Sequence, residues 1–476
     1  MRDLQAVMDY FAEARVFGIR PGLDRIEALL EKLGHPESRY PVIHVAGTNG
    51  KGSVTAFLTA IAAQTGRRTG WYTSPYLEHF NERIRLIDGQ AGFEAFLAQP
   101  RSAEISDEQL IDVASTVREA AEAIQADGHE APTEFELITA SAFLFYAQEN
   151  CDLVILETGM GGRFDATNVV TQPLASIITA LGYDHQDRLG THLAEIAAEK
   201  AGIMKAGCPV IVLDPRIALD TRGEAESALE LLRSVAKAKN CPYTEIHESM
   251  IERLPRPAGQ MTQKFYFNGQ RQAYEIALLA DYQVYNAALA ITAAELFASE
   301  SEVRAGLKLA QWPGRFEFLR RQPPVIIDGA HNLQGVLALR AELERYFSGQ
   351  ELIFMTGILA DKEHEAMLTA LFANASFKTR AVFITEPPVP RAFGAQALAE
   401  ELARHLQGAE LIPYSGREEL MSGAPDTPTI YYERDYRRLA EDLPRLAEAW
   451  QLPLIAFGSL YLIGNSRPQL REAVAQ

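Results

Sequence analysis

Apolar, often β-branched runs alternate with helical patterns over most of the chain. Because each run is apolar without interruption, the strands it predicts are expected to be buried on both faces, as in parallel sheets covered by helices. The pattern therefore predicts an α/β fold. The predicted strands cover residues 42–46, 153–157, 176–179, 210–213, 325–328, 352–356, 382–385 and 454–457.

The chain of 476 residues is longer than one hydrophobic core usually supports, so more than one domain is expected. A charged helical pattern over 301–315 ends in Trp312-Pro313-Gly314, and strand–helix alternation restarts at Val325. We therefore expect a domain over 1–300 and a smaller doubly wound domain over 301–476. Two further segments are predicted by their turn residues: a β excursion over 240–280 with a turn at Asn268-Gly269, and a surface loop over 415–428.

Composition narrows the class of protein. A hydrophobic content of 47% and a charged content of 23% are ordinary for a globular protein. The sequence has no apolar run of about 20 residues and no signal-peptide core, and three scattered cysteines suit a reduced cytoplasmic setting. The net charge of −18 argues against nucleic-acid or membrane partners. It does not exclude ATP binding, because distant surface charges are screened and the cations near the phosphates determine whether ATP binds.

A glycine-rich turn follows the first predicted strand. Gly47, Gly50 and Gly52 surround Lys51, Ser53 follows, and a helical pattern begins there. Strand, glycine-rich turn with lysine and helix is the arrangement that binds nucleotide phosphates through backbone N–H groups and an ammonium. The alternative is an ordinary turn between a strand and a helix. The turn differs from a standard Walker A motif, because Gly52 separates Lys51 from Ser53.

Two side chains at or after the ends of predicted strands, together with Ser74, suggest a magnesium site. Glu157 closes one strand, His185 follows another, and Ser74 comes after Gly70-Trp71-Tyr72-Thr73. Ligands of α/β sheets bind at the carboxyl ends of strands, and Mg²⁺ prefers oxygen atoms shared with substrate phosphates. The alternatives are a capping or surface role for Glu157 and a structural role for His185, since histidine is an uncommon ligand of a hard cation.

Lys200 occupies an unexpected position for a lysine. In a helix over 191–205 it falls on the stripe of Leu193, Ile196 and Met204, opposite Glu199. It is therefore expected to point inward, where the amine reaches the nucleotide site and is open to chemical modification. The alternative is a lysine whose stem passes apolar neighbours and whose amine reaches water.

These motifs, in this order, resemble the Mur ligase superfamily, and most closely its folate branch, which comprises folylpolyglutamate synthase and bifunctional dihydrofolate synthase–folylpolyglutamate synthase. The resemblance implies an N-terminal P-loop-type ATP-binding domain like the Mur ligase central domain, and a smaller doubly wound C-terminal domain. It also implies a monomer that uses ATP to join L-glutamate to dihydropteroate, reduced folates or both, through an acyl phosphate. The matching motifs are 47–53, 72–77, 81–84, 157–168, 184–185, 199–203, 312–316, 328–332 and 458–461.

The resemblance also implies roles for individual residues. The catalytic residues would be Lys51, His331 and Lys200, the last of these as a carbamate. Ser459 would lie on the side that binds glutamate. Mg²⁺, at two sites, would be held by Ser74, Glu157 and His185. ATP would contact Asn49, Gly50, Lys51, Gly52, Ser53, Asn286, Arg315 and Asp328. The pterin substrate would contact Arg20, Pro21, Gly22, Thr133, Glu134, Phe135, Glu136, Phe164, Asp165 and Ala166. Phe135 is suited to stacking on a pterin, and a core role for this ring is the alternative.

The sequence departs from the family pattern at two places. Ala280-Asp281-Tyr282-Gln283 stands where many relatives carry Gly-x-His-Gln before the asparagine, and Asn465-Ser466 replaces an acidic and a small apolar residue. Two other functions remain open. A ligase for a nucleotide-linked cell-wall precursor is expected to carry a further N-terminal domain, for which a phosphate turn at residue 47 leaves no room. A nucleotide-binding regulator without catalysis is the second.

Overall fold

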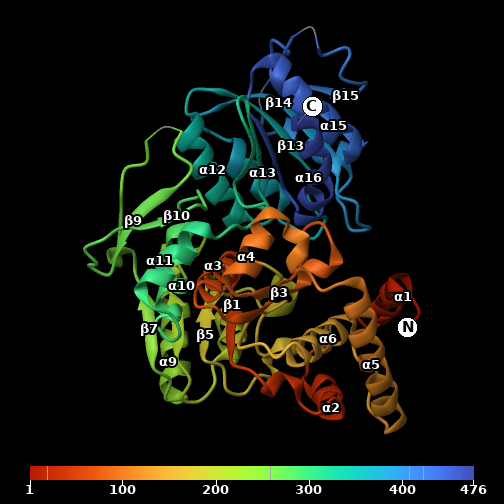
Figure 1. Ribbon diagram of the computed structural model, residues 1–476. Helices are drawn as coiled ribbons and strands as arrows, with labels where there is room; N and C mark the ends of the chain where they lie inside the picture. The colour runs from red at the N-terminus through yellow and green to blue at the C-terminus, as the bar shows by residue number, and fades with distance from the viewer. Residues whose placement is uncertain (19, 258, 407, 422, 476) are drawn as a thin grey trace. The chain divides into compact units, whose positions relative to one another are not determined.

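The computed structural model describes residues 1–18, 20–257, 259–406, 408–421 and 423–475. It divides the chain into two compact units (Figure 1). The first comprises Met1–Leu279 and Gln283–Gln311, and the second comprises Ala280–Tyr282 and Trp312–Gln476. Each unit contains a seven-stranded sheet in its described residues. The predicted α/β fold class is confirmed. In the described residues no helix is long and apolar enough to cross a bilayer.

The sheet of the first unit has the order β3-β2-β4-β1-β5-β6-β7. Neighbouring strands are parallel except β3, which runs antiparallel to β2 at the edge. Strands β4, β1, β5 and β6 were predicted from the sequence, whereas β2, β3 and β7 were not. The bounds are β1 (Val42–Ala46), β2 (Arg68–Tyr72), β3 (Ile84–Asp88), β4 (Leu153–Glu157), β5 (Ala175–Ile178), β6 (Val210–Leu213) and β7 (Tyr243–Ile246).

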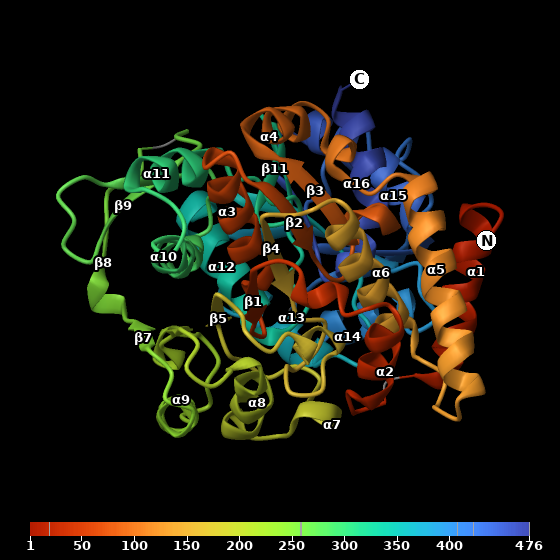
Figure 2. The same cartoon turned by 60° about the horizontal axis from the view of Figure 1, so that its bottom comes forward.

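Two sets of helices pack against this sheet (Figure 2). The first set contacts the sheet mainly through α3 and α10. The second set buries its apolar side chains with those of Val42, Val154 and Ile178 from the sheet. The first set is α3 (Lys51–Gln64), α4 (Gly89–Ala98), α10 (Gln283–Ala294) and α11 (Glu300–Leu309). The second is α1 (Leu4–Ala14), α2 (Asp24–Lys32), α5 (Asp107–Ala126), α6 (Glu134–Gln148), α8 (Leu193–Lys200) and α9 (Ala225–Ala238).

Helix α11 belongs to the first unit, although residues 301–311 were expected in the C-terminal domain. It packs closely on α3, and Gly306 lies directly against the backbone of Ala60 and Ile61. A side chain at position 306 would overlap that backbone. The observed division therefore falls between Gln311 and Trp312 rather than between residues 300 and 301.

The predicted β excursion is a separate antiparallel sheet with the order β10-β9-β8. Asn268 and Gly269 follow β9 and have φ angles of 50° and 71°. These left-handed conformations are those that Asn-Gly turns supply. The strands are β8 (Ile251–Arg253), β9 (Gln263–Phe267) and β10 (Tyr274–Ile276).

The sheet of the second unit has the order β11-β12-β17-β13-β14-β16-β15, with β11 antiparallel to β12 and the other neighbours parallel. β11, β15 and β16 were not predicted. The strands are β11 (Glu317–Arg321), β12 (Pro324–Ile327), β13 (Glu351–Thr356), β14 (Lys378–Glu386), β15 (Glu410–Pro413), β16 (Thr429–Asp435) and β17 (Leu454–Phe457). The helices are α12 (Leu333–Phe347), α13 (His364–Phe372), α14 (Ala395–Ala403), α15 (Tyr436–Trp450) and α16 (Leu460–Ala475).

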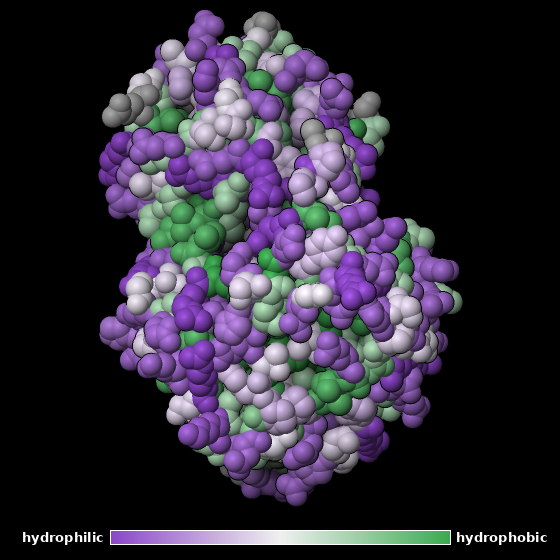
Figure 3. All heavy atoms as spheres, turned by 90° about the vertical axis from the view of Figure 1, so that its left-hand side faces the viewer, coloured by the Kyte–Doolittle hydropathy of each residue, from purple (hydrophilic) through white to green (hydrophobic). Residues whose placement is uncertain are grey.

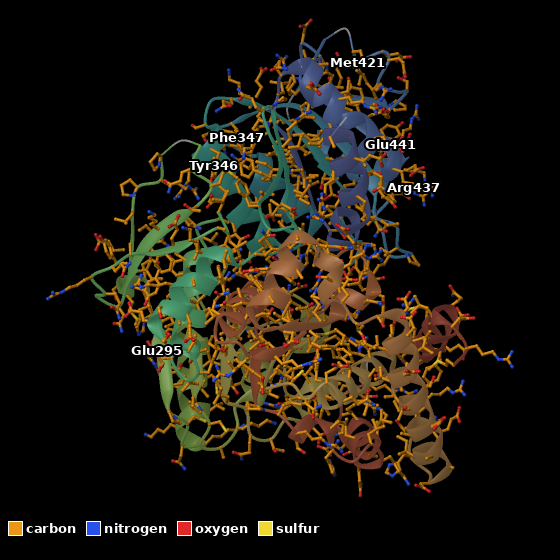
Figure 4. The ribbon with its side chains drawn as sticks, in the orientation of Figure 1. Glu295, Tyr346, Phe347, Met421, Arg437 and Glu441 are labelled. Carbon is orange, nitrogen blue, oxygen red and sulfur yellow. The ribbon has the colours of Figure 1, made fainter. Side chains whose placement is uncertain are left out.

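Surface character agrees with the composition. The described residues of 415–428 contain no helix or strand, as predicted, and Met421 in this segment is 48% exposed. Tyr346 and Phe347 are the last two residues of α12 (Figure 4). The Phe347 side chain is buried. The face shown in Figure 3 is largely hydrophilic with smaller apolar areas. That surface suits a chain with 63 acidic and 45 basic residues.

Candidate active site

The phosphate turn is fixed by the segment that follows β5. The Thr48 N–H donates to Ala180 O (2.9 Å), and the Thr179 hydroxyl donates to Asn49 O (2.7 Å). A side chain at Gly47 would overlap Thr179, so glycine is required there. The sequence analysis missed Thr179, although a hydroxyl residue directly after a buried strand was the available signal.

The amino end of α3 is shaped to receive an anion. The N-cap residue, Gly50, has φ 92° and, as a glycine, has no side chain that could accept from the first N–H groups of the helix. The first-turn N–H groups of a helix have no intrahelical acceptor, so they are available to phosphate oxygens. The Lys51 ammonium lies over the same turn, where Nζ donates to Gly47 O (3.1 Å). These features fit the triphosphate of ATP.

Asn286 lies against this turn despite the altered sequence that precedes it. A Cβ atom on Gly50 would lie 2.5 Å from Asn286 Oδ1. The Asn286 amide donates to Gln283 Oε1 (2.9 Å), and Gln283 Nε2 donates to Ser53 Oγ (3.1 Å). The spacing of Gln283 and Asn286 is therefore sufficient to place both side chains at the turn.

The changed residues before Gln283 belong to the second unit. There the Asp281 N–H donates to Glu342 Oε1 (2.7 Å), and the Asp281 carboxylate pairs with Arg345. Nothing in the structure explains the second departure, Asn465-Ser466.

The three predicted magnesium ligands lie at or beyond the carboxyl ends of β4, β2 and β5, and of these strands only β2 and β4 are direct neighbours. Glu157 closes β4, is 4% exposed and is in register with Val45 of β1. Ser74 follows β2, and His185 caps α7 (Gln186–Leu189) with a partly exposed side chain. Within the described ranges, no group of three or more His, Cys, Asp or Glu side chains could hold a metal ion. The assignment of Ser74, Glu157 and His185 as magnesium ligands therefore stays a prediction.

The Lys200 side chain points inward, as predicted, and only 2% of the residue is exposed. Burial, assisted by the positive charge of Lys51, lowers the pKa of the Lys200 amine to about 7. The carboxylates of Asp184 and Asp165 oppose this shift. Lys200 thus shares one electrostatic environment with three segments whose charges shift its pKa: the phosphate turn, the segment before His185 and the loop after β4.

The three segments expected to bind the pterin substrate are neighbours. The buried Arg25 guanidinium donates to Arg20 O (2.7 Å) and pairs with Glu136 of α6 (3.0 Å). Phe135, also in α6, lies against Gly159 of the loop that follows β4, since a Cβ atom there would lie 2.5 Å from the ring. These contacts connect residues 20–22, 133–136 and 159–166 within the first unit.

Exposure differs among these predicted pterin contacts. Arg20 and Pro21 are exposed, Gly22 is partly exposed, and Glu134 pairs with Arg15 (2.9 Å). Thr133 and Glu136 are buried and form the capping box of α6. Phe164 is 49% exposed, whereas Asp165 and Ala166 are buried. Direct contact with a ligand is therefore open to Phe164, while Thr133 and Glu136 hold the helix end.

The second unit collects its predicted residues at the carboxyl ends of β12 and β17. Asp328 accepts from the N–H groups of Phe316 (2.7 Å) and Ala330 (2.8 Å). Burial raises the pKa of the Asp328 carboxyl group, and the nearby Arg315 guanidinium opposes that shift. A side chain at Gly329 would overlap Arg315, so the glycine leaves room for the guanidinium.

Two further residues of this unit were assigned to the glutamate side. His331 lies after β12, with Nδ1 2.7 Å from Gly329 O. The buried Ser459 follows β17 and accepts from the Tyr461 N–H (3.2 Å). β12 and β17 are adjacent strands, so the two side chains follow the same edge of the sheet.

Comparisons with known proteins decide the family. The model of the Mur ligase middle domain matches residues 102–294, and that of the Mur ligase glutamate ligase domain matches residues 314–425. The dihydrofolate synthase/folylpolyglutamate synthase of Bacillus subtilis is 38% identical over 368 residues, which are 75% of this chain and 79% of that protein. The chain belongs to the folylpolyglutamate and dihydrofolate synthase family of Mur ligases. The predicted enzyme class, an ATP-dependent ligase, is thereby confirmed.

Solved structures agree over almost the whole chain. Mycobacterium tuberculosis folylpolyglutamate synthase complexed with ADP and AMPPCP is 28% identical and superposes with a TM-score of 0.79, covering 98% of this chain and 99% of that one. An FPGS–AMPPCP–folate complex is 28% identical, with a TM-score of 0.74 and the same coverage. These relatives bind nucleotide and folate, which supports the predicted use of ATP and small-molecule substrates.

Proposed function

We propose that this family member joins L-glutamate to the carboxylate of dihydropteroate, of reduced folates or of both. The observation that carries the proposal is the buried Lys200 amine, which shares one electrostatic environment with the phosphate turn and the loop that follows β4. That loop also contacts Phe135, one of the residues expected to bind the pterin. Nucleotide and pterin residues therefore surround one buried, modifiable amine.

The reaction has two displacement steps. A carboxylate oxygen of the folate substrate attacks the γ-phosphorus of ATP, which releases ADP and leaves an acyl phosphate. The glutamate amine then attacks the acyl carbon, loses a proton and releases phosphate, which leaves an amide. Charge develops on the transferring phosphoryl group, and the N–H donors at 50–53 and the Lys51 ammonium are proposed to stabilise it. Asn49, Asn286, Arg315 and Asp328 are proposed to contact the nucleotide.

Mg²⁺, at two proposed sites and held by Ser74, Glu157 and His185, would neutralise phosphate charge when bound. Lys200 is proposed to be carbamylated: the neutral amine nitrogen bonds to the carbon of CO₂, a proton leaves, and a carbamate anion replaces a cation. A pKa of about 7 supports this chemistry, because it leaves a large neutral fraction near neutral pH.

The remaining proposed roles concern the substrates. His331 and Ser459 would contact L-glutamate, and the segments around Arg20, Phe135 and Phe164 would contact the pterin. We also propose a cytoplasmic monomer. The net charge of −18 supports the absence of nucleic-acid and anionic-membrane partners.

Mass spectrometry of products tests the proposal. The chain is incubated with MgATP and L-glutamate, in parallel with dihydropteroate and with tetrahydrofolate. The expected result is a mass increase of one or more glutamyl residues on at least one of them, and the pattern tells which activity is present. Glutamate addition only to a uridine-nucleotide precursor would favour a cell-wall ligase. ATP binding without any product would favour a regulator.

A further inference from the structure

His44 is a polar residue in the middle of a buried strand. All five residues of β1 are buried, and the His44 imidazole is completely so. Burial, assisted by the positive charge of Lys205, lowers the pKa of His44 to about 3. The ring is therefore neutral near pH 7 and carries a single N–H group. Its Nε2 atom lies 2.8 Å from the Thr167 hydroxyl in the loop that follows β4.

Thr167 connects this imidazole to Asp165. The Thr167 hydroxyl donates to Asp165 Oδ1 (2.5 Å), and the Thr167 N–H donates to the same oxygen (3.0 Å). Because a hydroxyl has one proton, its oxygen accepts from His44, and the imidazole proton must be on Nε2. His44 Nδ1 has no hydrogen-bond partner in the part of the chain that the structure describes. The three side chains form a directed chain from His44 through Thr167 to Asp165.

The Asp165 carboxylate fixes the shape of its own loop. Its second oxygen, Oδ2, accepts from the Met160 N–H (2.8 Å), so the carboxylate bridges Met160 and Thr167. Asp165 is 6% exposed, whereas Phe164 next to it is 49% exposed. The carboxylate therefore holds the loop from inside while the aromatic residue remains accessible. On the other side of Phe164, the Arg163 N–H donates to Glu199 O (2.7 Å).

We propose that His44 and Thr167 are positioning residues for folate binding: they orient Asp165, which fixes the loop over 158–169 and presents Phe164 to the substrate. The inference rests on the proposed function, in which this loop contacts the pterin. The same strand, β1, leads into the phosphate turn at Gly47. The hydrogen-bonded chain therefore ties the folate loop to the strand that carries the nucleotide site.

Steady-state kinetics of two Thr167 variants test the inference. Thr167→Val has nearly the same shape but neither accepts from His44 nor donates to Asp165, whereas Thr167→Ser retains the hydroxyl. Loss of a hydrogen bond to a charged group predicts a rise of about tenfold in the KM for the folate substrate. The kcat and the KM for ATP should stay within about twofold of wild type, and Thr167→Ser should restore the folate KM.

A second measurement covers the case in which Thr167→Val does not fold. His44→Leu removes only the first hydrogen bond and should raise the folate KM in the same direction by a smaller factor. In both variants the backbone amide protons of residues 160 and 167 should exchange with solvent faster than in wild type, because their acceptor, the Asp165 carboxylate, is less well held.

The outcomes separate the two proposals. A wild-type folate KM in Thr167→Val and His44→Leu overturns the positioning role and leaves glutamate ligation intact. An equal rise in the KM values for folate and ATP also overturns it, since that pattern indicates a general structural defect. Absence of glutamate ligation in the wild type overturns the proposed function, and this inference with it.

Discussion

At the scale of single residues, Lys200 owes its chemistry to its surroundings. A solvent-exposed lysine has a pKa near 10.4 and is almost fully protonated at pH 7. Burial and the positive charge of Lys51 bring the pKa of Lys200 to about 7, so about half of the amines are neutral there. Only the neutral form has the lone pair needed for the proposed attack on CO₂.

Replacement of this lysine should remove ligation without unfolding the chain. We expect Lys200→Ala to lower kcat at least about 100-fold, the order of magnitude for loss of one preorganised charge in an active site. Lys200→Arg should fail similarly, because a guanidinium stays protonated and forms no carbamate. Lys32→Ala is the matched control, since Lys32 is an exposed lysine paired with Asp127. Wild-type turnover in Lys200→Ala would contradict the proposed role.

The lowered pKa also predicts how stability depends on pH. Between about pH 7 and the usual lysine pKa, the unfolded chain binds a proton at Lys200 that the folded chain does not. The free energy of unfolding therefore rises with pH through this window. Below about pH 7 the contribution of the neutral Lys200 amine to the free energy of unfolding is lost. Urea unfolding in CO₂-free buffer should show a steeper rise for wild type than for Lys200→Met. Parallel pH profiles would mean that the folded amine titrates normally.

Glu157 should matter through magnesium. Glu157→Gln keeps the size of the side chain but removes its charge, so we expect the Mg²⁺ concentration for half-maximal turnover to rise about tenfold or more. A magnesium titration at saturating ATP measures this. Glu122→Gln, in an exposed part of α5, is the control. An unchanged titration in Glu157→Gln would remove Glu157 from the proposed ligand set.

At the scale of elements, a capping box stabilises the amino end of α6, which is proposed to contact the pterin. The Thr133 hydroxyl accepts from the Glu136 N–H (3.3 Å), and the Glu136 carboxylate accepts from the Thr133 N–H (2.7 Å). We expect Thr133→Ala to lower the free energy of unfolding by about 1 kcal/mol, the usual loss for such a cap. Thr133→Ser should retain most of it. Urea unfolding measures the difference, and equal values for both variants would contradict the cap.

The sequence was most informative about elements that are buried on both faces. β1, β4, β6 and β17 have the predicted bounds, because an uninterrupted apolar run leaves few alternatives. Strands at or next to a sheet edge are partly solvated, and their polar residues interrupt the apolar run that would predict a strand. β15 is exposed along its whole length, and β16 ends in Glu433-Arg434-Asp435.

The same limit applies to the site. The turn at 47–53, Glu157 and the inward face of Lys200 follow from local patterns. The contacts of Thr179 with Asn49, and of His44 with Thr167, join residues more than 100 positions apart in the chain. Spacing within one element carries no information about such pairs.

At the scale of the whole molecule, the two units have separate sheets and separate tryptophans. Trp71 is buried in β2 of the first unit, and Trp450 of the second donates to Leu420 O (2.9 Å). The phosphate turn belongs to the first unit. A bound nucleotide stabilises the folded state that binds it by about 2.7 kcal/mol at 100 times its Kd. The first unit should therefore gain more stability from MgADP.

Single-tryptophan variants test this expectation. Trp312→Phe/Trp450→Phe reports unfolding around Trp71, and Trp71→Phe/Trp312→Phe reports unfolding around Trp450. MgADP should shift the urea midpoint of the Trp71 transition more than that of the Trp450 transition. Unfolding without nucleotide provides the baseline for each variant. Equal shifts would show that both units unfold as one or contribute equally to nucleotide binding.

The close packing of Gly306 has a consequence for how this chain tolerates change. Gly306 packs on helix α3, which starts at Lys51. A side chain at position 306 would therefore displace the helix whose amino end belongs to the phosphate turn. Gly306, although remote in sequence from residues 47–53, is therefore expected to tolerate replacement poorly. Engineering that seeks sites for labels or insertions in this helix should use its exposed positions, such as Glu300, and leave the glycine untouched.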